Sequence, residues 1–280
     1  MPLELRVIEV EGKAGAEAVR GGKRVGRLVA ALQEDDVRGL HAWSSLADHE
    51  LAPGEDPELY RDLYSVAGAA WVDAGYLDHY VVVPADEGVL AAWYSLSFAQ
   101  QQVHGAQALA PIAATEPEGF TVRRAGPEDI EAAMALAFTI FDHQAGAPTW
   151  AGAPAPPEDE ARASYLEYLA DPDVAYFLAE RDGEPLGHLA LERESDSTAN
   201  LSIAATVPEA RGLGVGKALT ETALGWAREE GYATCVTDWR SANLLAARFW
   251  PSQGFRPTAY RLYRSITVTP RDRHPRSAPA

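Results

Sequence analysis

The strongest chemical signature in the sequence is the stretch 211–217, Arg-Gly-Leu-Gly-Val-Gly-Lys, in which three glycines alternate between two cations. Glycines remove side chains where the backbone turns, so that successive N–H groups can converge on an anion. Arg211 and Lys217 add full positive charge, and a helix predicted to begin at Val215 adds the positive end of its dipole. The stretch therefore predicts a cradle for a pyrophosphate group.

Two familiar phosphate-binding loops are excluded by their spacing. A dinucleotide-binding Gly-x-Gly-x-x-Gly loop needs glycine at position 217, where the sequence has Lys217. A nucleotide-triphosphate loop of the Gly-x-x-x-x-Gly-Lys-Ser/Thr type needs glycine at 211 and a hydroxyl residue at 218, where Arg211 and Ala218 stand. The ligand is therefore expected to carry a diphosphate of another kind.

The pattern Arg-x-x-Gly-x-Gly at 211–216 resembles the acyl-CoA pyrophosphate loop of the GNAT superfamily of N-acetyltransferases. The family's next helix reads Asn-x-x-Ala-x-x-x-Tyr-x-x-x-Gly-Phe, and four positions here match it: Asn243, Ala246, Gly254 and Phe255. Trp250 stands where the family has tyrosine. The resemblance covers residues 120–266 and implies an α/β (α+β) fold with a mixed, mostly antiparallel sheet flanked by helices.

The resemblance also implies a co-substrate and a mechanism. Acetyl-CoA, or another short acyl-CoA, would lie between two splayed strands, with no metal required, and a primary amine would attack the thioester directly in a ternary complex. A strand backbone N–H would polarise the thioester carbonyl. The residues expected to contact the co-substrate are Ala205, Thr206, Val207, Arg211, Gly212, Leu213, Gly214, Val215, Gly216, Lys217, Asn243 and Trp250.

The proton-transfer groups are not determined by the motif. Trp250 replaces the tyrosine that protonates the departing thiolate in many family members, and an indole N–H is no usable acid near neutral pH. The expected fourth strand of the domain, residues 200–207, carries no carboxylate. Candidate bases are therefore Glu192, Asp238 and His143, with a water chain as the alternative.

The elements that must position these residues follow from hydrophobic periodicity and turn signals. Helices are predicted at 127–141, 158–170, 215–230 and 242–250, and strands at 120–124, 174–180, 185–192, 200–207, 233–237 and 256–265. Gly231 is placed to end the third helix in a left-handed conformation. The loop 144–157 is expected to help shape the acceptor pocket.

The N-terminal third resembles a second, truncated copy of the same block. Gly22 and Gly26 precede Gly183 and Gly187 by 161 residues, while Trp93 and Phe98 precede Trp250 and Phe255 by 157. Where this copy should hold its phosphate loop, residues 51–59 contain three acidic residues and no cation. We therefore expect the first copy to lack a CoA site.

These patterns predict four segments. They are a degenerate GNAT-like lobe at 1–106, a linker at 107–118, a GNAT acyltransferase domain at 119–266 and a disordered tail at 267–280.

Composition limits the partners. Twenty-four basic and 41 acidic residues give a net charge of −17, which disfavours nucleic acid and anionic membranes and suits a cationic amine, whether a small molecule or a peptide. We expect a cytoplasmic protein because no apolar run is long enough for a membrane span or a secretory signal. A homodimer is possible. The alternatives to an N-acetyltransferase are a non-catalytic acyl-CoA-binding or regulatory protein and a structural protein.

Overall fold

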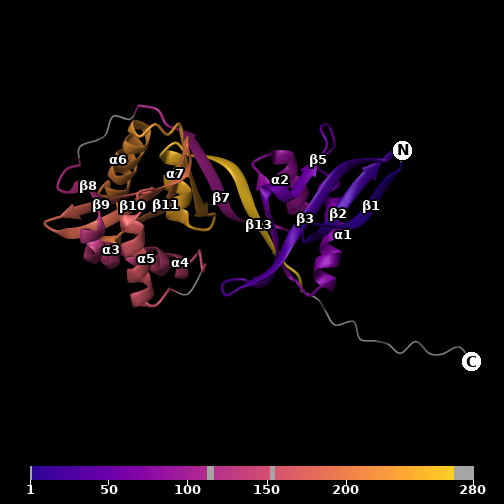
Figure 1. The fold of residues 1–280 in the computed structure, drawn as a ribbon, viewed down its shortest axis with the longest axis horizontal. Coiled ribbons are helices and arrows are strands. Elements are labelled where there is room, and N and C mark those ends of the chain that lie inside the picture. The colour runs from indigo at the N-terminus through magenta and orange to yellow at the C-terminus, as the bar shows by residue number, and fades with distance from the viewer. Residues whose placement is uncertain (1, 112–116, 152–154, 268–280) are drawn as a thin grey trace, which may run out of the picture. The chain divides into compact units, whose positions relative to one another are not determined.

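The computed structural model describes residues 2–111, 117–151 and 155–267, and the chain forms two compact units (Figure 1). The first unit comprises Met1–Ala99 with Leu262–Ala280, and the second comprises Gln100–Arg261. The predicted tail lies almost wholly outside the described residues, as does the centre of the predicted linker, 112–116.

The second unit is built on a mixed sheet. Its strands are β7 (Ala99–Ala108), β8 (Thr121–Ala125), β9 (Val174–Arg181), β10 (Glu184–Ser195), β11 (Thr198–Thr206), β12 (Thr234–Arg240) and the first part of β13 (Arg256–Ser265). Neighbouring strands follow the order β13-β7-β12-β11-β10-β9-β8. β8 to β11 pair antiparallel in turn, β12 pairs parallel with β11, and β12 pairs antiparallel with β7. The predicted mostly antiparallel sheet is confirmed.

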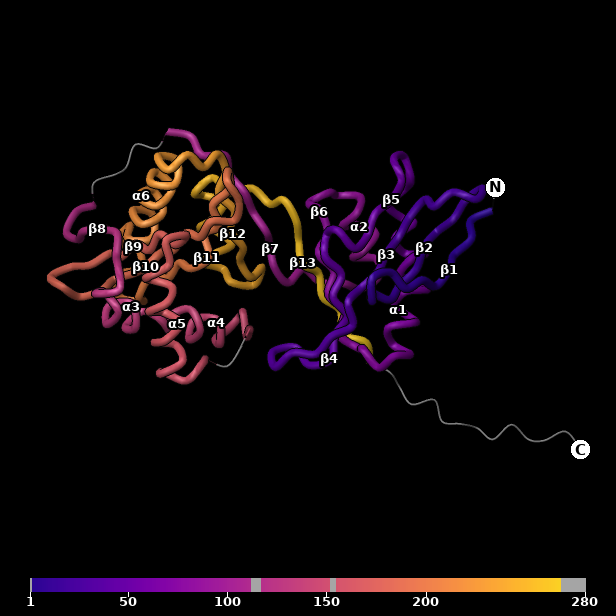
Figure 2. The backbone as a smooth tube through the Cα atoms, in the orientation of Figure 1, coloured from indigo at the N-terminus to yellow at the C-terminus, as the bar shows by residue number. Residues whose placement is uncertain are grey.

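Helices cover both faces of this sheet (Figure 2). They are η2 (Pro127–Asp129), α3 (Ile130–Ala137), α4 (Thr139–Ala145), α5 (Glu158–Ala170), η3 (Pro208–Ala210), α6 (Val215–Glu229) and α7 (Leu244–Ser252). Successive strand residues point to opposite faces. Accordingly, Leu189 packs in the cluster that contains α6 residues, whereas Ala190 packs with residues of α3 and α5.

One predicted helix is divided in the structure. The periodicity at 130, 134, 137 and 141 predicts a single helix, but α3 ends at Ala137 and α4 begins at Thr139. The break separates a buried helix from a partly exposed one, because α3 buries Leu136 and Ala137 whereas no residue of α4 is fully buried. The helix that begins at Val215 ends as predicted, with Gly231 at φ 96°.

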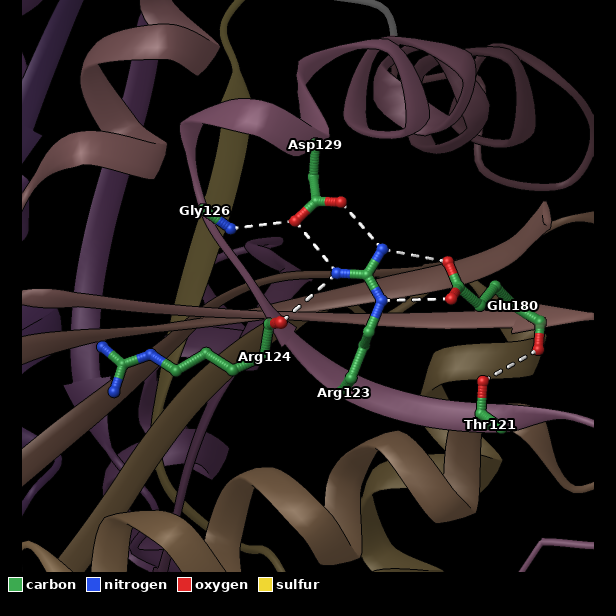
Figure 3. Close-up of polar contacts among 6 residues, drawn as sticks. All are labelled: Thr121, Arg123, Arg124, Gly126, Asp129 and Glu180. Atoms are coloured by element: carbon green, nitrogen blue, oxygen red, sulfur yellow. Dashed lines mark hydrogen bonds and ion pairs between the residues drawn. The ribbon is translucent and has the colours of Figure 1, made fainter.

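Strand β8 is fastened to the sheet by an ionic cluster at its exposed face (Figure 3). The guanidinium of Arg123 lies between two carboxylates, 2.7 Å from Asp129 Oδ1 and 3.0 Å from Glu180 Oε1. Asp129 also accepts the N–H of Gly126 at 3.0 Å, which closes the turn into η2. Hydrogen bonding from Arg123 lowers the pKa of Asp129, so that this carboxylate stays charged.

The first unit repeats the core of this architecture. Its elements are β1 (Leu3–Val10), β2 (Lys13–Arg20), β3 (Lys23–Asp35), β4 (Gly39–Ser44), η1 (Leu46–Asp48), β5 (His49–Leu51), α1 (Leu59–Asp73), β6 (Asp78–Pro84), α2 (Glu87–Ser95) and the end of β13. β4 and β6 pair parallel, as β11 and β12 do in the second unit. A two-residue turn joins β1 to β2, in place of the helices that join β8 to β9. The predicted truncated duplication is confirmed at the level of fold.

Equivalent residues make equivalent contacts in the two units. A Cβ on Gly26 would lie 3.0 Å from Cδ1 of Leu63 in α1, and one on Gly187 would lie 3.3 Å from Cδ1 of Leu219 in α6. Each unit also packs a tryptophan of its last helix edge-on against the next phenylalanine, with ring centroids 4.9 Å apart for Trp93–Phe98 and 5.4 Å for Trp250–Phe255. The strand-to-helix contact and the tryptophan–phenylalanine contact are therefore the same in both units.

Each unit contains a strand segment that follows the other unit's elements in the sequence. β7 follows the elements of the first unit in the chain but pairs with β12, so residues 100–108 lie in the second unit. Residues 262–265 of β13 lie in the first unit, where Tyr263 donates to Asp78 Oδ1 at 2.6 Å. The units therefore divide at residues other than the predicted boundaries 106 and 119, because strand pairing between distant segments leaves no mark in local sequence patterns.

Candidate active site

The glycine-rich stretch forms an open loop before α6. Gly212 and Gly214 have φ of 82° and 85°, a left-handed conformation in which β-carbon-bearing residues are strained. Gly214 caps the helix without a side-chain acceptor, so the first-turn amides of Val215, Gly216 and Lys217 are not used by the cap. A Cβ added at Gly212 or Gly214 would meet no atom within 4 Å, which means the loop faces free space.

The two parallel strands separate next to this loop. β11 and β12 pair only from Thr198–Thr234 to Leu201–Thr237. Beyond that point β11 continues along β10 as far as Thr206, while β12 continues along β7 as far as Arg240. A bulge at Ser202 shifts the register where the strands part. The separation leaves strand edges without a ladder partner and opens the sheet.

A cavity of about 630 Å³ fills this opening. The glycine loop lines it from one side, and α4, the strand edges and α7 line the rest. Ten residues expected to contact the co-substrate line it: Ala205, Thr206, Arg211, Gly212, Gly214, Val215, Gly216, Lys217, Asn243 and Trp250. The lining combines the amides and cations of the loop with apolar side chains such as Leu189, Leu201 and Phe249.

Two expected contacts are placed elsewhere. The N–H of Val207 donates to Leu186 O at 3.0 Å, so it is already used by the sheet. The side chain of Leu213 is not among the cavity's lining residues and is half exposed. Because strand amides alternate in direction, the amides of Ala204 and Thr206 are the ones that face the open edge. Ala204 lines the cavity and was missed, although the two-residue alternation could have indicated it.

The charges around the cavity are mostly positive. Its lining holds four residues with permanent positive charge: Arg211, Lys217, Arg240 and Arg248. Asp238 is the sole carboxylate among the described residues that line it, and it accepts a hydrogen bond from Gln102 Nε2. The cavity thus combines a cationic, phosphate-compatible region with one anionic group.

The three candidate bases have different surroundings. Asp238 and His143 line the cavity, but Glu192 does not and instead accepts the hydroxyl hydrogen bond of Tyr168. Nε2 of His143 lies 3.1 Å from Oδ1 of Asn243. The structure therefore brings two of the three candidates to the predicted site, on α4 and β12.

A second histidine of the cavity wall is neutral. His188 on β10 is buried, and its Nδ1 is hydrogen-bonded to the hydroxyl of Tyr176. Burial lowers the pKa of His188 to about 4, so the ring carries no charge near neutral pH. Sequence reasoning did not single out this residue, because an isolated histidine in a strand gives no motif.

Trp250 and Cys235, two further residues of the second unit that could do chemistry, are both buried. Trp250 is buried against Phe249 and Phe255 at the cavity wall and supplies packing rather than a proton. Cys235 is buried, and burial raises the pKa of its thiol to about 12. The thiol therefore stays protonated and lacks the thiolate that a nucleophile needs.

In the first unit, an aromatic side chain stands at the position that corresponds to the open glycine loop of the second unit. α1 carries buried Tyr60 at its second position, where α6 carries Gly216. Tyr60 stacks on Trp93 at 5.8 Å between ring centroids. The acidic turn before α1 is engaged as well, since Glu55 pairs with Arg20 at 2.5 Å. The start of α1 in the first unit is therefore occupied by aromatic packing and an ion pair, whereas the start of α6 is open.

Comparison with known proteins places these features in a family. Residues 139–255 match the acetyltransferase (GNAT) family. An uncharacterized N-acetyltransferase of Mycobacterium tuberculosis is 31% identical over 102 residues, which are 36% of this chain and 65% of that protein. The mycothiol acetyltransferase of Thermomonospora curvata is 32% identical over 145 residues, 50% of this chain and 46% of its own. The chain thus spans between about half and about two thirds of the length of these relatives.

Solved structures share the fold over most of the chain. A GCN5-related N-acetyltransferase from Sphaerobacter thermophilus superimposes with a TM-score of 0.64 and 15% identity, covering 93% of this chain and 83% of its own. A tandem GNAT protein from the clavulanic acid biosynthesis pathway does so with a TM-score of 0.52 and 14% identity, covering 95% and 84%.

The splayed parallel strands, the glycine-rich helix start and the cavity between them define an acetyltransferase-type fold. The family match lies wholly within the second unit. Residues 139–255 of the second unit therefore carry an acetyltransferase (GNAT) family domain, and the first unit repeats the core of that fold in truncated form. Among the described residues, no helix combines the length and apolar character that crossing a membrane requires.

Proposed function

We propose that the chain transfers an acetyl or other small acyl group from acyl-CoA to a primary amine, directly and in a ternary complex. The observation that carries this proposal is the cavity between β11 and β12, which begins at the open amides of the glycine loop. An acyl-CoA supplies an activated thioester when bound. The loop amides, Arg211 and Lys217 would hold its diphosphate, and the edge amides of Ala204 and Thr206 would hold the pantetheine arm.

The acceptor we propose is a cationic amine. Asp238 is the one carboxylate lining the cavity among the described residues, and it would attract and orient an ammonium group before proton loss. A relative named N-acetyltransferase supports transfer to nitrogen, and one named mycothiol acetyltransferase supports acetyl transfer. An amine on a small molecule and an amine on a peptide both satisfy this chemistry.

The role we propose for the first unit is structural, with one acyl-CoA per chain. Tyr60 occupies the position that corresponds to Gly216, and the acidic turn before α1 carries the same sign of charge as a phosphate. Like charge and a filled space both oppose a diphosphate there.

Two measurements test the proposed function. Titration calorimetry with acetyl-CoA should show one site per chain. Thiol release should then follow with at least one member of a panel containing an amino sugar, an amino-acid amide and a short peptide. Binding without thiol release for any amine would favour a non-catalytic acyl-CoA-binding protein, in line with Trp250 at the family's tyrosine position. Absence of binding would refute the proposal.

A further inference from the structure

We infer that His143 accepts the proton of the attacking amine and that Asn243 positions it for this task, an inference that rests on the proposed function. His143 lies on α4 and lines the cavity, and Asn243 lies at the start of α7 on the wall of the same cavity. The two side chains, 100 positions apart in sequence, meet in one hydrogen bond.

The capping contacts decide which amide atom of Asn243 faces the histidine. Oδ1 of Asn243 accepts the backbone N–H groups of Leu245 and Ala246, both at 3.2 Å, and so caps α7. An amide nitrogen cannot accept these hydrogen bonds, so the amide has only one orientation consistent with the cap. The atom 3.1 Å from His143 Nε2 is therefore an oxygen.

This contact in turn decides the tautomer of His143. An amide oxygen only accepts hydrogen bonds, so Nε2 of His143 must carry hydrogen. The neutral ring then has its lone pair on Nδ1, the nitrogen that the cap does not engage. Asn243 thus plays toward His143 the part that an orienting acceptor plays toward a catalytic base, holding one nitrogen protonated so that the other can take a proton.

The proton transfer balances without any further reactant. The amine nitrogen forms a bond to the thioester carbonyl carbon, the carbon–sulfur bond breaks, and its electron pair leaves with the sulfur. The proton that the nitrogen loses passes to Nδ1 of His143, and the positive ring is stabilised through Nε2–H by the oxygen of Asn243. Solvent or the thiolate then takes the proton from Nδ1.

The other candidates are less suited to this role. Glu192 lies outside the cavity lining and receives the hydroxyl hydrogen of Tyr168. Asp238 is held by Gln102 and is assigned above to the ammonium group. The charged or titratable groups that share the cavity wall with His143 are Arg211, Lys217, Asp238, Arg240, Arg248 and His188.

The first test reads the ring directly in the free protein. Long-range ¹H–¹⁵N NMR should show His143 as the Nε2–H tautomer, and the spectrum of Asn243→Ala should shift toward a mixture of both tautomers. Asn243→Asp keeps an oxygen acceptor at the cap and should keep the Nε2–H form. A wild-type ring in the Nδ1–H form would overturn the inference.

The second test uses activity with the best amine of the panel. His143→Ala should lower kcat about 100-fold or more, leave the affinity for acetyl-CoA unchanged, and recover part of kcat when imidazole is added. Asn243→Asp should move the acid limb of the kcat–pH profile to higher pH, because a carboxylate favours the protonated ring. A structural role alone predicts neither the rescue nor the movement of that limb.

The outcomes separate this inference from the proposed function. If wild-type protein releases thiol and His143→Ala does so equally fast, the inference is wrong while the proposed function stands. If wild-type protein binds acetyl-CoA but releases no thiol with any amine, both are wrong. Asp86→Ala is the matched control for Asn243→Ala, because Asp86 caps the equivalent helix of the first unit.

Discussion

Asp86 and Asn243 cap corresponding helices of the two units and stand 157 residues apart, the same interval that separates Trp93 from Trp250. Asp86 Oδ1 accepts the N–H of Val89 at 2.9 Å, while Asn243 Oδ1 serves two amides and His143 as well. The cap is common to both copies of the fold. The contact to a histidine in a cavity belongs to the second copy.

The two caps should therefore be equivalent for stability and different for activity. Removing either with alanine should lower the free energy of unfolding by about 1 kcal/mol, since a helix amide loses its acceptor. Urea titration would measure this loss. Asn243→Ala should also slow thiol release, whereas Asp86→Ala should leave it at the wild-type rate. Equal damage to activity by both variants would mean that the effect is one of folding.

Gly214→Glu should abolish binding of acetyl-CoA. The change puts a side chain and a negative charge at the helix start where the diphosphate is proposed to lie, and calorimetry measures the outcome. Gly183→Glu is the matched control, because Gly183 has a similar φ of 83° and open space around its Cβ position but lies in the β9–β10 turn. Both variants carry the same backbone strain, so unchanged affinity in Gly214→Glu would place the phosphates elsewhere.

Asp238→Asn should weaken binding of the amine acceptor and leave the affinity for acetyl-CoA unchanged. Loss of the negative charge should raise KM for a cationic amine about tenfold, which corresponds to a charged hydrogen bond of roughly 1.5 kcal/mol. An asparagine oxygen can still accept from Gln102, so the local packing should persist. Steady-state kinetics with varied amine and varied acetyl-CoA would separate the two effects. A changed affinity for acetyl-CoA alone would contradict the assignment.

Glu55→Gln should leave the stoichiometry at one acetyl-CoA per chain. The variant removes an acidic charge from the first unit's turn but leaves Tyr60 in place, so the space that a diphosphate needs remains filled. Calorimetry at saturating ligand would report the number of sites. A second site in this variant would show that charge alone, rather than the filled space, prevents binding in the first unit.

Stability should fall as the medium is acidified, in part because of His188. Its pKa is about 4 in the folded chain and about 6.5 when unfolded, so the unfolded chain binds more protons between these values. The contribution of His188 to the free energy of unfolding is therefore complete above pH 6.5 and is lost toward pH 4. The loss between pH 7.5 and pH 5 is about 2 kcal/mol. Urea titrations at these two pH values should show a smaller difference in His188→Gln. An unchanged difference would mean that His188 is accessible to protons in the folded protein.

Local sequence patterns predicted much of the fold and part of the site. The ends of α5 and β13, the cap at Gly231 and the β9–β10 hairpin follow from periodicity and turn residues, which act within a few positions. The glycine loop was also readable, because its chemistry depends on backbone freedom at adjacent positions.

The features that sequence did not reveal depend on packing between distant segments. The break between α3 and α4 separates a buried helix from a partly exposed one. The backbone N–H of Val207 is hydrogen-bonded to Leu186 O of the neighbouring strand, and local sequence does not reveal that pairing. The hydrogen bond between His143 and Asn243 joins residues that no motif relates. Such contacts appear only when the sheet is assembled.

Strand β13 contributes Arg256–Arg261 to the second unit and its remaining residues to the first. During synthesis at the ribosome, the N-terminal unit must therefore wait for nearly the whole described chain to emerge before its sheet is complete. Proteolysis just before Arg256 would remove a strand from both units at once. The last strand thus couples the maturation of two lobes of which only one is proposed to bind acyl-CoA.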